Sequence, residues 1–346
     1  MRESPAEEVA DFSPAWWLPG AHLQTVWGRL ARSRTQVPLV REALTAPDGD
    51  TLFLDHADAA LEKDAPPLLI LHGLEGSSHS VYAQGMLAEA ARAGLGASVL
   101  NFRSCARDLA NLRRTIPNQR ARLYHSGETT DFDFVARTLA ARHGRPILAA
   151  GVSLGGNVLL KWLGEHPHER IVAAAATLSV PYDLAAGDRH MSSFPSAVYV
   201  RSFVKTLTPK TEALVHRFPE AAARVDVARA ARAWTFREFD DAANAPLHGF
   251  SGAADYYTRC SSLPGLSRIS VPTLCISALD DPFVPAETVE RARRAASTAV
   301  RFLVTRKGGH VGWVAARGLA PVYWAEERAI AFLARHAGGR VFATRC

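Results

Sequence analysis

Short apolar runs alternate with amphipathic stretches along the chain from about residue 65 onward. Apolar runs bounded by glycine or polar residues predict buried β-strands, and apolar positions spaced by three and four predict helices. The predicted strands cover residues 67–73, 97–102, 146–150, 171–178, 272–278 and 301–305, and the predicted helices cover residues 81–93, 131–142, 157–166, 287–296 and 323–336. This alternation predicts an α/β fold, with a mostly parallel sheet and helices on both of its faces.

The alternation stops at about residue 183 and resumes near residue 265. The residues between these points contain several helical stretches and aromatic clusters but no strand of the same quality. We therefore predict one α/β domain over residues 1–346, with a helical cap inserted at about residues 183–265. The cap is expected over the carboxyl edge of the sheet, where ligands bind in open α/β folds.

The composition agrees with a globular protein that has a sizeable core, because 48% of the 346 residues are hydrophobic and 21% are charged. The first eleven residues are acidic and polar, which is unlike a signal peptide, and no apolar run is long enough to span a membrane. The cysteines at positions 105, 260, 275 and 346 have no paired spacing and are expected to be free thiols. These features predict a soluble, cytoplasmic protein without a stable membrane anchor.

The net charge of +6 invites a nucleic-acid hypothesis, but the arginines are spread along the whole chain. Their one local concentration lies within residues 103–122 and is opposed there only by Asp108. The simplest interpretation is a solvated basic loop, and contact with an anionic partner or a membrane surface is the alternative. We expect no nucleic-acid partner.

Cofactor and metal motifs are absent from the sequence. It has no Walker motif and no G-x-G-x-x-G after the first predicted strand. The densest group of ligand-type residues, His166-Pro-His168-Glu169, does not have the i, i+4 spacing of a zinc-binding helix. We therefore predict neither a cofactor nor a metal ion.

The segment Gly151-Val-Ser153-Leu-Gly155 has the form G-x-S-x-G. It follows a predicted strand and leads directly into a predicted helix, which is the context of a nucleophile elbow. Glycines are needed on both sides because a side chain there would clash with neighbouring backbone. The pattern predicts Ser153 as a nucleophile, and a serine that merely caps the helix is the alternative.

Acyl transfer also needs two backbone N–H groups directed at the developing oxyanion. One comes from the residue after the nucleophile and the other from the loop after an earlier strand. These positions are Leu154 and Leu74, the latter within His72-Gly-Leu-Glu-Gly76. His72 itself is expected to have a structural role at the end of its strand.

The acid and base of a catalytic triad should follow the serine in that order. Asp280 and Asp281 come after the strand predicted at residues 272–278, and His310 follows the strand predicted at 301–305 within a glycine-flanked loop. Adjacent residues at a strand end point in opposite directions, so only one carboxylate can face the histidine. Asp281-Pro-Phe-Val-Pro285 has the form Asp-x-x-Val-Pro, which Asp280 would fit only if the spacing slipped by one residue. Ser153, Asp281 and His310 are therefore predicted as the triad.

Further motifs carry a family resemblance over about residues 14–335. They are His22-Leu-Gln-Thr25, His72-Gly-Leu-Glu-Gly-Ser-Ser78, Asn101-Phe-Arg103, Tyr124-His-Ser-Gly-Glu128, Gly151-Val-Ser-Leu-Gly-Gly-Asn157, Phe239-Asp240, Gly249-Phe250, Tyr256-Tyr257, Asp280-Asp-Pro-Phe283 and Gly308-Gly-His310. In these motifs the chain resembles the YheT-type branch of the AB hydrolase superfamily. The resemblance implies the α/β-hydrolase fold and hydrolysis of carboxylic esters, with a small-molecule acyl ester or a lipid as substrate.

One departure from the family pattern and one of these motifs are described separately. After Asn101-Phe-Arg103 the family usually continues with a Gly-Cys-Ser-Gly turn, whereas this chain has Ser104-Cys-Ala-Arg and a longer basic segment up to Leu123. Apart from the resemblance, Tyr124-His-Ser-Gly-Glu128 is interpreted as a turn that leads into the next helix, with Thr130 as its possible cap.

Three functional hypotheses remain at this point. The first is a serine esterase that works through an acyl-enzyme intermediate. The second is an acyltransferase with the same triad, and the third is a non-catalytic ligand-binding protein on a hydrolase scaffold, for which a damaged triad is expected. In either enzyme, most aromatic residues of the cap would pack it onto the sheet and some would line an apolar acyl pocket: Phe194, Tyr199, Phe203, Trp234, Phe236, Phe250, Tyr256 and Tyr257.

Overall fold

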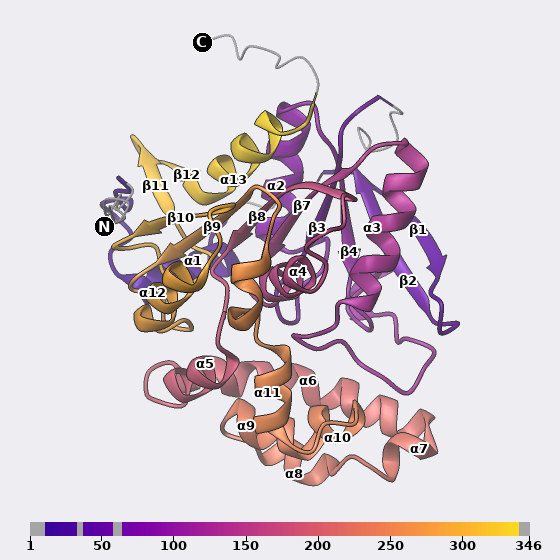
Figure 1. Cartoon of the computed structure of the whole chain (residues 1–346). Coiled ribbons are helices and arrows are strands. Elements are labelled where there is room, and N and C mark those ends of the chain that lie inside the picture. The colour runs from indigo at the N-terminus through magenta and orange to yellow at the C-terminus, as the bar shows by residue number, and fades with distance from the viewer. Residues whose placement is uncertain (1–10, 33–36, 58–63, 339–346) are drawn as a thin grey trace.

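The computed structural model describes residues 11–32, 37–57 and 64–338, which form an eight-stranded sheet covered by helices (Figure 1). The strand order is β1-β2-β4-β3-β7-β8-β9-β10. From β4 to β10 all neighbours are parallel, while β1 and β2 pair antiparallel at one edge. The strands are β1 (Leu39–Thr45), β2 (Thr51–Ala57), β3 (Pro67–Leu71), β4 (Gly96–Asn101), β7 (Ile147–Val152), β8 (Val172–Leu178), β9 (Thr273–Ala278) and β10 (Val300–Thr305).

The predicted α/β fold and mostly parallel sheet are confirmed, and the six predicted strands are β3, β4, β7, β8, β9 and β10. The antiparallel pair β1–β2 was not predicted. Its first strand is only half-buried and carries charged residues, so it lacks the apolar run that marks the central strands.

Helices cover both faces of the sheet and pack on separate apolar clusters. Helices α2 (Val81–Arg92) and α13 (Trp324–Arg335) contribute to one cluster, and α3 (Thr130–His143), α4 (Leu154–Glu165) and α12 (Ala286–Ala295) contribute to the other. The short helix α1 (Ala21–Leu30) lies against α2. Because helices cover both faces, the central strands β3, β4 and β7 are buried at every residue.

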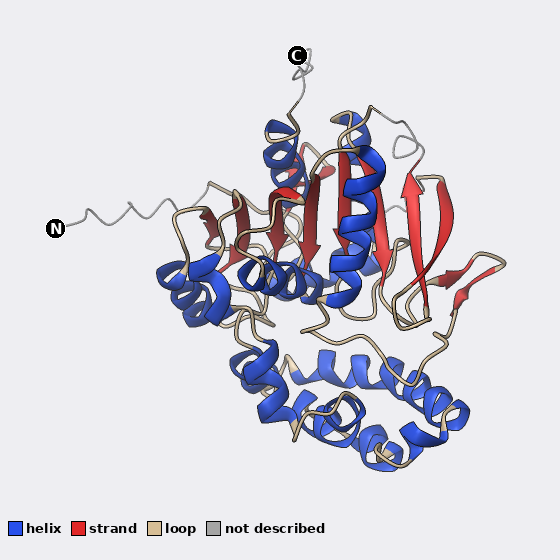
Figure 2. Cartoon of the chain, turned by 45° about the vertical axis from the view of Figure 1, so that its right-hand side comes forward, coloured by secondary structure: helices blue, strands red, loops and turns tan. Residues whose placement is uncertain are grey.

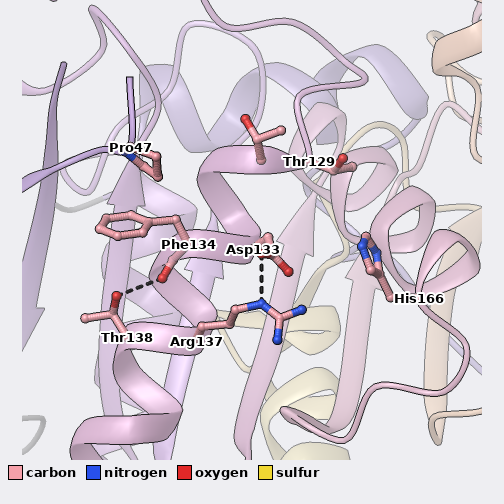
Figure 3. A pocket seen from close by; sticks show the side chains of 8 residues that line it. Pro47, Thr129, Asp133, Phe134, Arg137, Thr138 and His166 are labelled. Atoms are coloured by element: carbon pink, nitrogen blue, oxygen red, sulfur yellow. Dashed lines mark hydrogen bonds and ion pairs between the residues drawn. The ribbon is translucent and has the colours of Figure 1, made fainter. Parts of the chain in front are cut away.

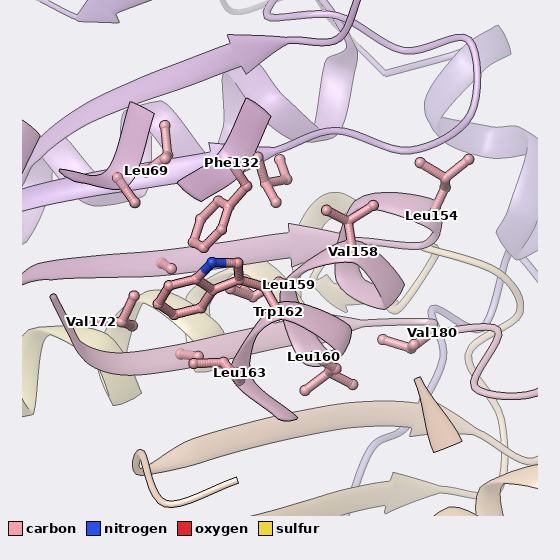
Figure 4. Packing of buried hydrophobic residues seen from close by; sticks show 14 of the residues in the cluster. Leu69, Phe132, Leu154, Val158, Leu159, Leu160, Trp162, Leu163, Val172 and Val180 are labelled. Carbon is pink, nitrogen blue, oxygen red and sulfur yellow. The ribbon is translucent and has the colours of Figure 1, made fainter. Parts of the chain in front are cut away.

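The larger cluster has Trp162 of α4 near its centre (Figure 4). Its indole packs edge-on against Phe132 of α3, with ring centroids 5.1 Å apart. The indole Nε1 donates a hydrogen bond of 3.0 Å to Asp133, so the buried ring leaves no polar atom without a partner. This contact fixes α3 and α4 side by side on the sheet.

Between β8 and β9 the chain leaves the sheet and forms a group of helices that we call the cap (Figures 1 and 2). The cap consists of α5 (Leu184–Met191), α6 (Ala197–Arg217), α7 (Pro219–Ala222), α8 (Val227–Arg232), α9 (Phe236–Phe239), the π-helical turn Asp240–Asn244, α10 (Ala245–Leu247), α11 (Ala253–Cys260) and the 3₁₀ helix Leu263–Arg268. It has an apolar cluster of its own, in which α6 contributes the most buried residues and the helices from α5 to α10 contribute most of the rest. The division of the chain into one domain with an inserted cap at 183–265 stays a prediction.

The basic segment after β4 contains a small hairpin of β5 (Arg107–Asp108) and β6 (Asn111–Thr115), which stands apart from the main sheet in Figure 2. Arg113, Arg114 and Arg120 are exposed there, as a solvated loop requires. Arg103, in contrast, is 3% exposed and donates hydrogen bonds of 2.6 to 2.8 Å to Asp50 and Asp131. The segment is therefore not simply a solvated loop, because its first arginine ties β4 to α3.

Two further sequence predictions concern the cysteines and membrane spans. Cys105, Cys260 and Cys275 are buried free thiols, whereas Cys346 and the first ten residues lie outside the described part of the chain. Within the described ranges, no helix is long and apolar enough to cross a membrane.

Replacing Arg103 with Gln should lower the free energy of unfolding by about 3–5 kcal/mol, because Asp50 and Asp131 would lose a buried cationic partner. Urea denaturation followed by circular dichroism measures the change. The matched control Arg113→Gln removes an exposed arginine of β6 and should change stability by no more than about 0.5 kcal/mol. Equal stability of the two variants would contradict this account of Arg103.

Candidate active site

Ser153 stands at the sharp turn between β7 and α4, with a backbone φ of 53°. Space at this turn explains both glycines of the G-x-S-x-G motif. A Cβ on Gly151 would lie 2.6 Å from the carbonyl oxygen of Gly155, and a Cβ on Gly155 would lie 2.5 Å from that of His72. Since neither position can hold a side chain, the serine is presented on a turn whose geometry the packing dictates.

The hydroxyl of Ser153 is hydrogen-bonded to His310, which is in turn hydrogen-bonded to Asp281. The Ser153 Oγ lies 2.9 Å from His310 Nε2, and His310 Nδ1 lies 2.9 and 3.1 Å from the two oxygens of Asp281. A carboxylate can only accept, so Nδ1 carries the proton and Nε2 is free to accept from the serine hydroxyl. Three residues far apart in the sequence thus form one chain of hydrogen bonds at the carboxyl ends of β7, β9 and β10.

Asp281 and Asp280 make different contacts. Asp281 is 4% exposed, and its Oδ1 also accepts hydrogen bonds from the backbone N–H groups of Phe283 and Val284. Asp280 Oδ1 instead accepts a hydrogen bond of 2.9 Å from the N–H of Gly309. Asp280 therefore holds the loop that carries His310, while Asp281 contacts the imidazole itself.

Helix α1 supports the same loop. Thr25 Oγ1 accepts a hydrogen bond of 2.9 Å from the N–H of His310, and Gln24 bonds to both the N–H and the carbonyl of Val314. The His22-Leu-Gln-Thr25 motif was noted in the sequence only as a mark of resemblance. Its position 285 residues before His310 gave no local signal of this contact.

The two predicted oxyanion donors lie on either side of Ser153. Leu154 is the first residue of α4, and Leu74 lies in the turn Gly73–Gly76 after β3. Within the described part of the chain, neither N–H has a hydrogen-bond acceptor, whereas the N–H groups of Gly73 and Glu75 donate to tyrosine hydroxyls. The turn therefore leaves the Leu74 amide available.

His72 is fully buried beside this turn, and both ring nitrogens are occupied by backbone. Nδ1 donates to the carbonyl of Gly73, and Nε2 accepts from the N–H of Phe102. Burial lowers the pKa of His72 to about 3, so the ring is neutral and fixed in one tautomer. These contacts fit a structural role at the end of β3.

The motif Tyr124-His-Ser-Gly-Glu128 joins the start of α4 to the cap. Asn157 Nδ2 donates to the carbonyls of Ser126 and Cys260, and the Ser126 N–H donates to the hydroxyl of Tyr256 in α11. The interpretation of Thr130 as a cap is wrong, because α3 begins at Thr130 itself. The carboxylate of Glu128 accepts the Thr130 N–H instead.

Aromatic side chains of the cap pack on Phe283, which itself stacks on His310. The ring of Phe283 stacks on His310 with centroids 4.1 Å apart, and Tyr199 and Phe203 of α6 pack against Phe283. Of the other aromatic residues named from the sequence, Phe194 and Trp234 are exposed, and Tyr256 and Tyr257 are buried in a separate cluster around α11. Tyr199 and Phe203 therefore connect the cap to Phe283, the residue that stacks on His310.

A surface pocket elsewhere does not coincide with these residues (Figure 3). It lies around the first half of α3, and none of its lining residues belongs to the hydrogen-bonded chain or to the turn Gly73–Gly76. Its charged side chains already have partners, since Arg137 pairs with Asp133 and Glu169. Across residues 11–32, 37–57 and 64–338, no three His, Cys, Asp or Glu side chains are grouped as metal ligands.

Comparison with known proteins identifies the family. A family model described as "alpha/beta hydrolase fold" matches residues 66–313. The chain is 36% identical over 323 residues to "Putative esterase YheT" of Escherichia coli (strain K12), and the match covers 92% of both proteins. It is 29% identical over 311 residues to phospholipase ABHD3 of Mus musculus, covering 88% of this chain and 73% of that protein.

Among solved structures, an esterase of Pyrococcus furiosus has the same fold, with a TM-score of 0.54 at 15% identity. That match covers 86% of this chain and 93% of the esterase. The chain therefore belongs to the α/β-hydrolase fold family and, within it, to the YheT-type branch.

Proposed function

We propose that this protein is a serine hydrolase that cleaves carboxylic esters through an acyl-enzyme intermediate. The observation that carries the proposal is the chain of hydrogen bonds from Ser153 through His310 to Asp281, with 2.9 Å at both of its steps. The family supports the coarser part of the proposal, since relatives are named as an esterase and as a phospholipase.

The proposed reaction begins when Ser153 Oγ attacks the ester carbonyl carbon and His310 Nε2 takes the hydroxyl proton. The negative charge that develops on the carbonyl oxygen is stabilised by the N–H groups of Leu74 and Leu154. His310 then gives its proton to the leaving alcohol, and the serine holds the acyl group as an ester. A water molecule releases the acid by the same steps, with His310 again as the base.

Asp281 acts on the histidine rather than on the substrate. Its carboxylate keeps the Nδ1 proton in place and stabilises the positive charge that His310 gains during each step. Two backbone N–H groups and a nearly complete lack of exposure hold this carboxylate in one orientation. The ring of Phe283 stacks on the imidazole and further restricts the rotation of the imidazole.

The proposed substrates are acyl esters with short-to-medium chains, or lipids that present such an ester. Phe283, Tyr199 and Phe203 form apolar surface beside the histidine, which suits an acyl chain or an apolar alcohol group. The names of the two relatives point to the same class. The proposed location remains the cytoplasm.

Replacing Ser153 with Ala should lower kcat for a p-nitrophenyl ester by about 10⁴ or more, because the nucleophile is lost. Labelling by a fluorophosphonate probe should disappear with it. Ser251→Ala, an exposed position in the cap, is the matched control and should keep both activities. Undiminished labelling of a folded Ser153→Ala protein would refute the assignment.

The neighbouring carboxylates give a second test. Asp281→Asn should lower kcat by about 10⁴, since the amide can no longer hold the imidazole in its reactive tautomer. Asp280→Asn should keep at least about a tenth of kcat, because an amide oxygen can still accept the Gly309 N–H. Both variants should be checked for folding by circular dichroism. The reverse ranking would move the catalytic acid to Asp280.

A panel of esters of increasing acyl length, with matched anilides, tests the reaction class. We expect measurable turnover of short-to-medium acyl esters and little amide hydrolysis. Added alcohols test the competing acyltransferase function, because a transferase would form new esters faster than free acid. Failure to turn over or be labelled by any acyl donor, in a folded protein that still binds ligands, would favour the non-catalytic alternative.

A further inference from the structure

Glu75 adopts a backbone conformation that is unusual for its residue type. It lies in the turn Gly73–Gly76, which is closed by a hydrogen bond of 3.0 Å from the Gly76 N–H to the Gly73 carbonyl. Its φ is 56°, in the left-handed region that glycine occupies without strain and that other residues adopt only at a cost. A glutamate at this position indicates that its side chain has a use there.

The Glu75 side chain is held by two partners from distant parts of the chain. Its Oε1 accepts a hydrogen bond of 2.7 Å from Lys210 Nζ and one of 2.9 Å from the hydroxyl of Tyr124. The same hydroxyl accepts the N–H of Glu75 at 2.8 Å. Tyr124 is itself fixed by stacking on Phe102 with parallel rings. The turn is therefore fastened at both its backbone and its side chain.

The ion pair between Glu75 and Lys210 is shielded from water, with side-chain exposures of 11% and 14%. Shielding strengthens a hydrogen-bonded pair of charges relative to a pair on the surface. Lys210 Nζ also lies 3.5 Å from Cys105 Sγ, but burial raises the pKa of that thiol to about 11. Cys105 is therefore neutral near pH 7, and the carboxylate of Glu75 is the anionic partner of the lysine.

Lys210 belongs to α6, the longest helix of the cap, whereas Glu75 belongs to the loop after β3. The pair thus joins the cap to the turn that carries Leu74, the residue immediately before Glu75. The same helix carries Tyr199 and Phe203, which pack against Phe283 beside the histidine. A shift of α6 would consequently move the partner of Glu75 and the apolar surface together.

We propose that the Glu75–Lys210 ion pair is a positioning device, through which the cap sets the direction of the Leu74 N–H in the oxyanion site. The inference rests on the proposed esterase function. Neither side chain reacts; both act through the Leu74 amide. Removing one oxyanion donor entirely costs about 10²–10³ in kcat, so misdirecting it should cost about tenfold or more.

The test compares variants of the pair with a matched control on the same helix. We expect Lys210→Met and Glu75→Gln to lower kcat for a p-nitrophenyl ester about tenfold or more, with KM changed less than about threefold. Lys210→Arg keeps the cation and should recover much of the loss. Lys205→Met removes an exposed lysine of α6 and should leave kcat unchanged.

An alkyl boronic acid provides a readout that cap stability alone would not change. Boron bonded to Ser153 becomes tetrahedral and places an oxygen near the oxyanion donors, as in the transition state. Its inhibition constant should rise by about the same factor as kcat/KM falls. In the double variant Glu75→Gln/Lys210→Met the loss should be no greater than in either single variant, because the two residues act as a unit.

Glu75→Gly keeps the experiment decisive if the other variants fold poorly. Glycine adopts the left-handed conformation without strain but lacks the carboxylate. The protein should therefore remain folded while kcat and boronate affinity fall. Variants with reduced thermal stability but unchanged kcat and boronate affinity would overturn the inference, leaving the pair a structural contact. If those variants keep their kcat while Ser153→Ala is inactive and unlabelled in the same assays, only the positioning role is refuted. Retained activity in Ser153→Ala would instead refute the proposed function.

Discussion

The start of α4 approaches the carboxyl end of β3 so closely that only glycine fits between them. A Cβ on Gly155 would lie 2.5 Å from the carbonyl oxygen of His72 and 2.6 Å from that of Leu71. This contact brings the serine turn against the loop after β3, where a Cβ on Gly73 would lie 3.3 Å from that of Ser153. One backbone-to-backbone contact therefore places Ser153 and both candidate oxyanion donors. The buried strands β3 and β7, paired residue by residue, keep that contact rigid.

The position of His310 is fixed in a different way. Its loop is held by hydrogen bonds from residues that are remote in the sequence. Thr25 of α1 accepts the N–H of His310, Asp280 accepts that of Gly309, and Ser179 Oγ accepts that of Val311. Three consecutive amides of the loop thus have partners from three different elements. A loop fastened in this way loses little entropy when the imidazole takes the orientation that the proposed reaction requires.

Much of this arrangement could be predicted from the sequence, because short apolar runs and short motifs mark its parts. The buried strands appear as apolar runs, and the elbow glycines, Asp281-Pro-Phe-Val-Pro285 and Gly308-Gly-His310 each follow one of them. The antiparallel β1 and β2 were missed because both have mixed composition: β1 is a half-buried edge strand with charged residues, and β2 carries Asp55 and His56 although most of its residues are buried. The contacts of Thr25 with His310 and of Lys210 with Glu75 span 285 and 135 residues, and no periodicity or motif records such a pairing. Thr130 was misassigned because a cap and a first helical residue differ by one position, which composition does not resolve.

The distribution of unusual backbone conformations links these observations. In the described residues, the non-glycine positions with positive φ are Glu75, Ser104, Ser153, Ser179, Val311 and Trp313. Each follows the carboxyl end of a sheet strand, respectively β3, β4, β7, β8 and, for the last two, β10. Such conformations raise the energy of the folded chain by about 1 kcal/mol or more each, so chance alone would not gather them at one edge.

Among the described residues, the Leu74 and Leu154 amides lie at this same edge and have no acceptor. The sheet and its two apolar clusters supply the rigidity that keeps these groups from relaxing. In the proposed reaction, the rigid backbone that holds these costly conformations also holds the oxyanion donors in place before the substrate arrives.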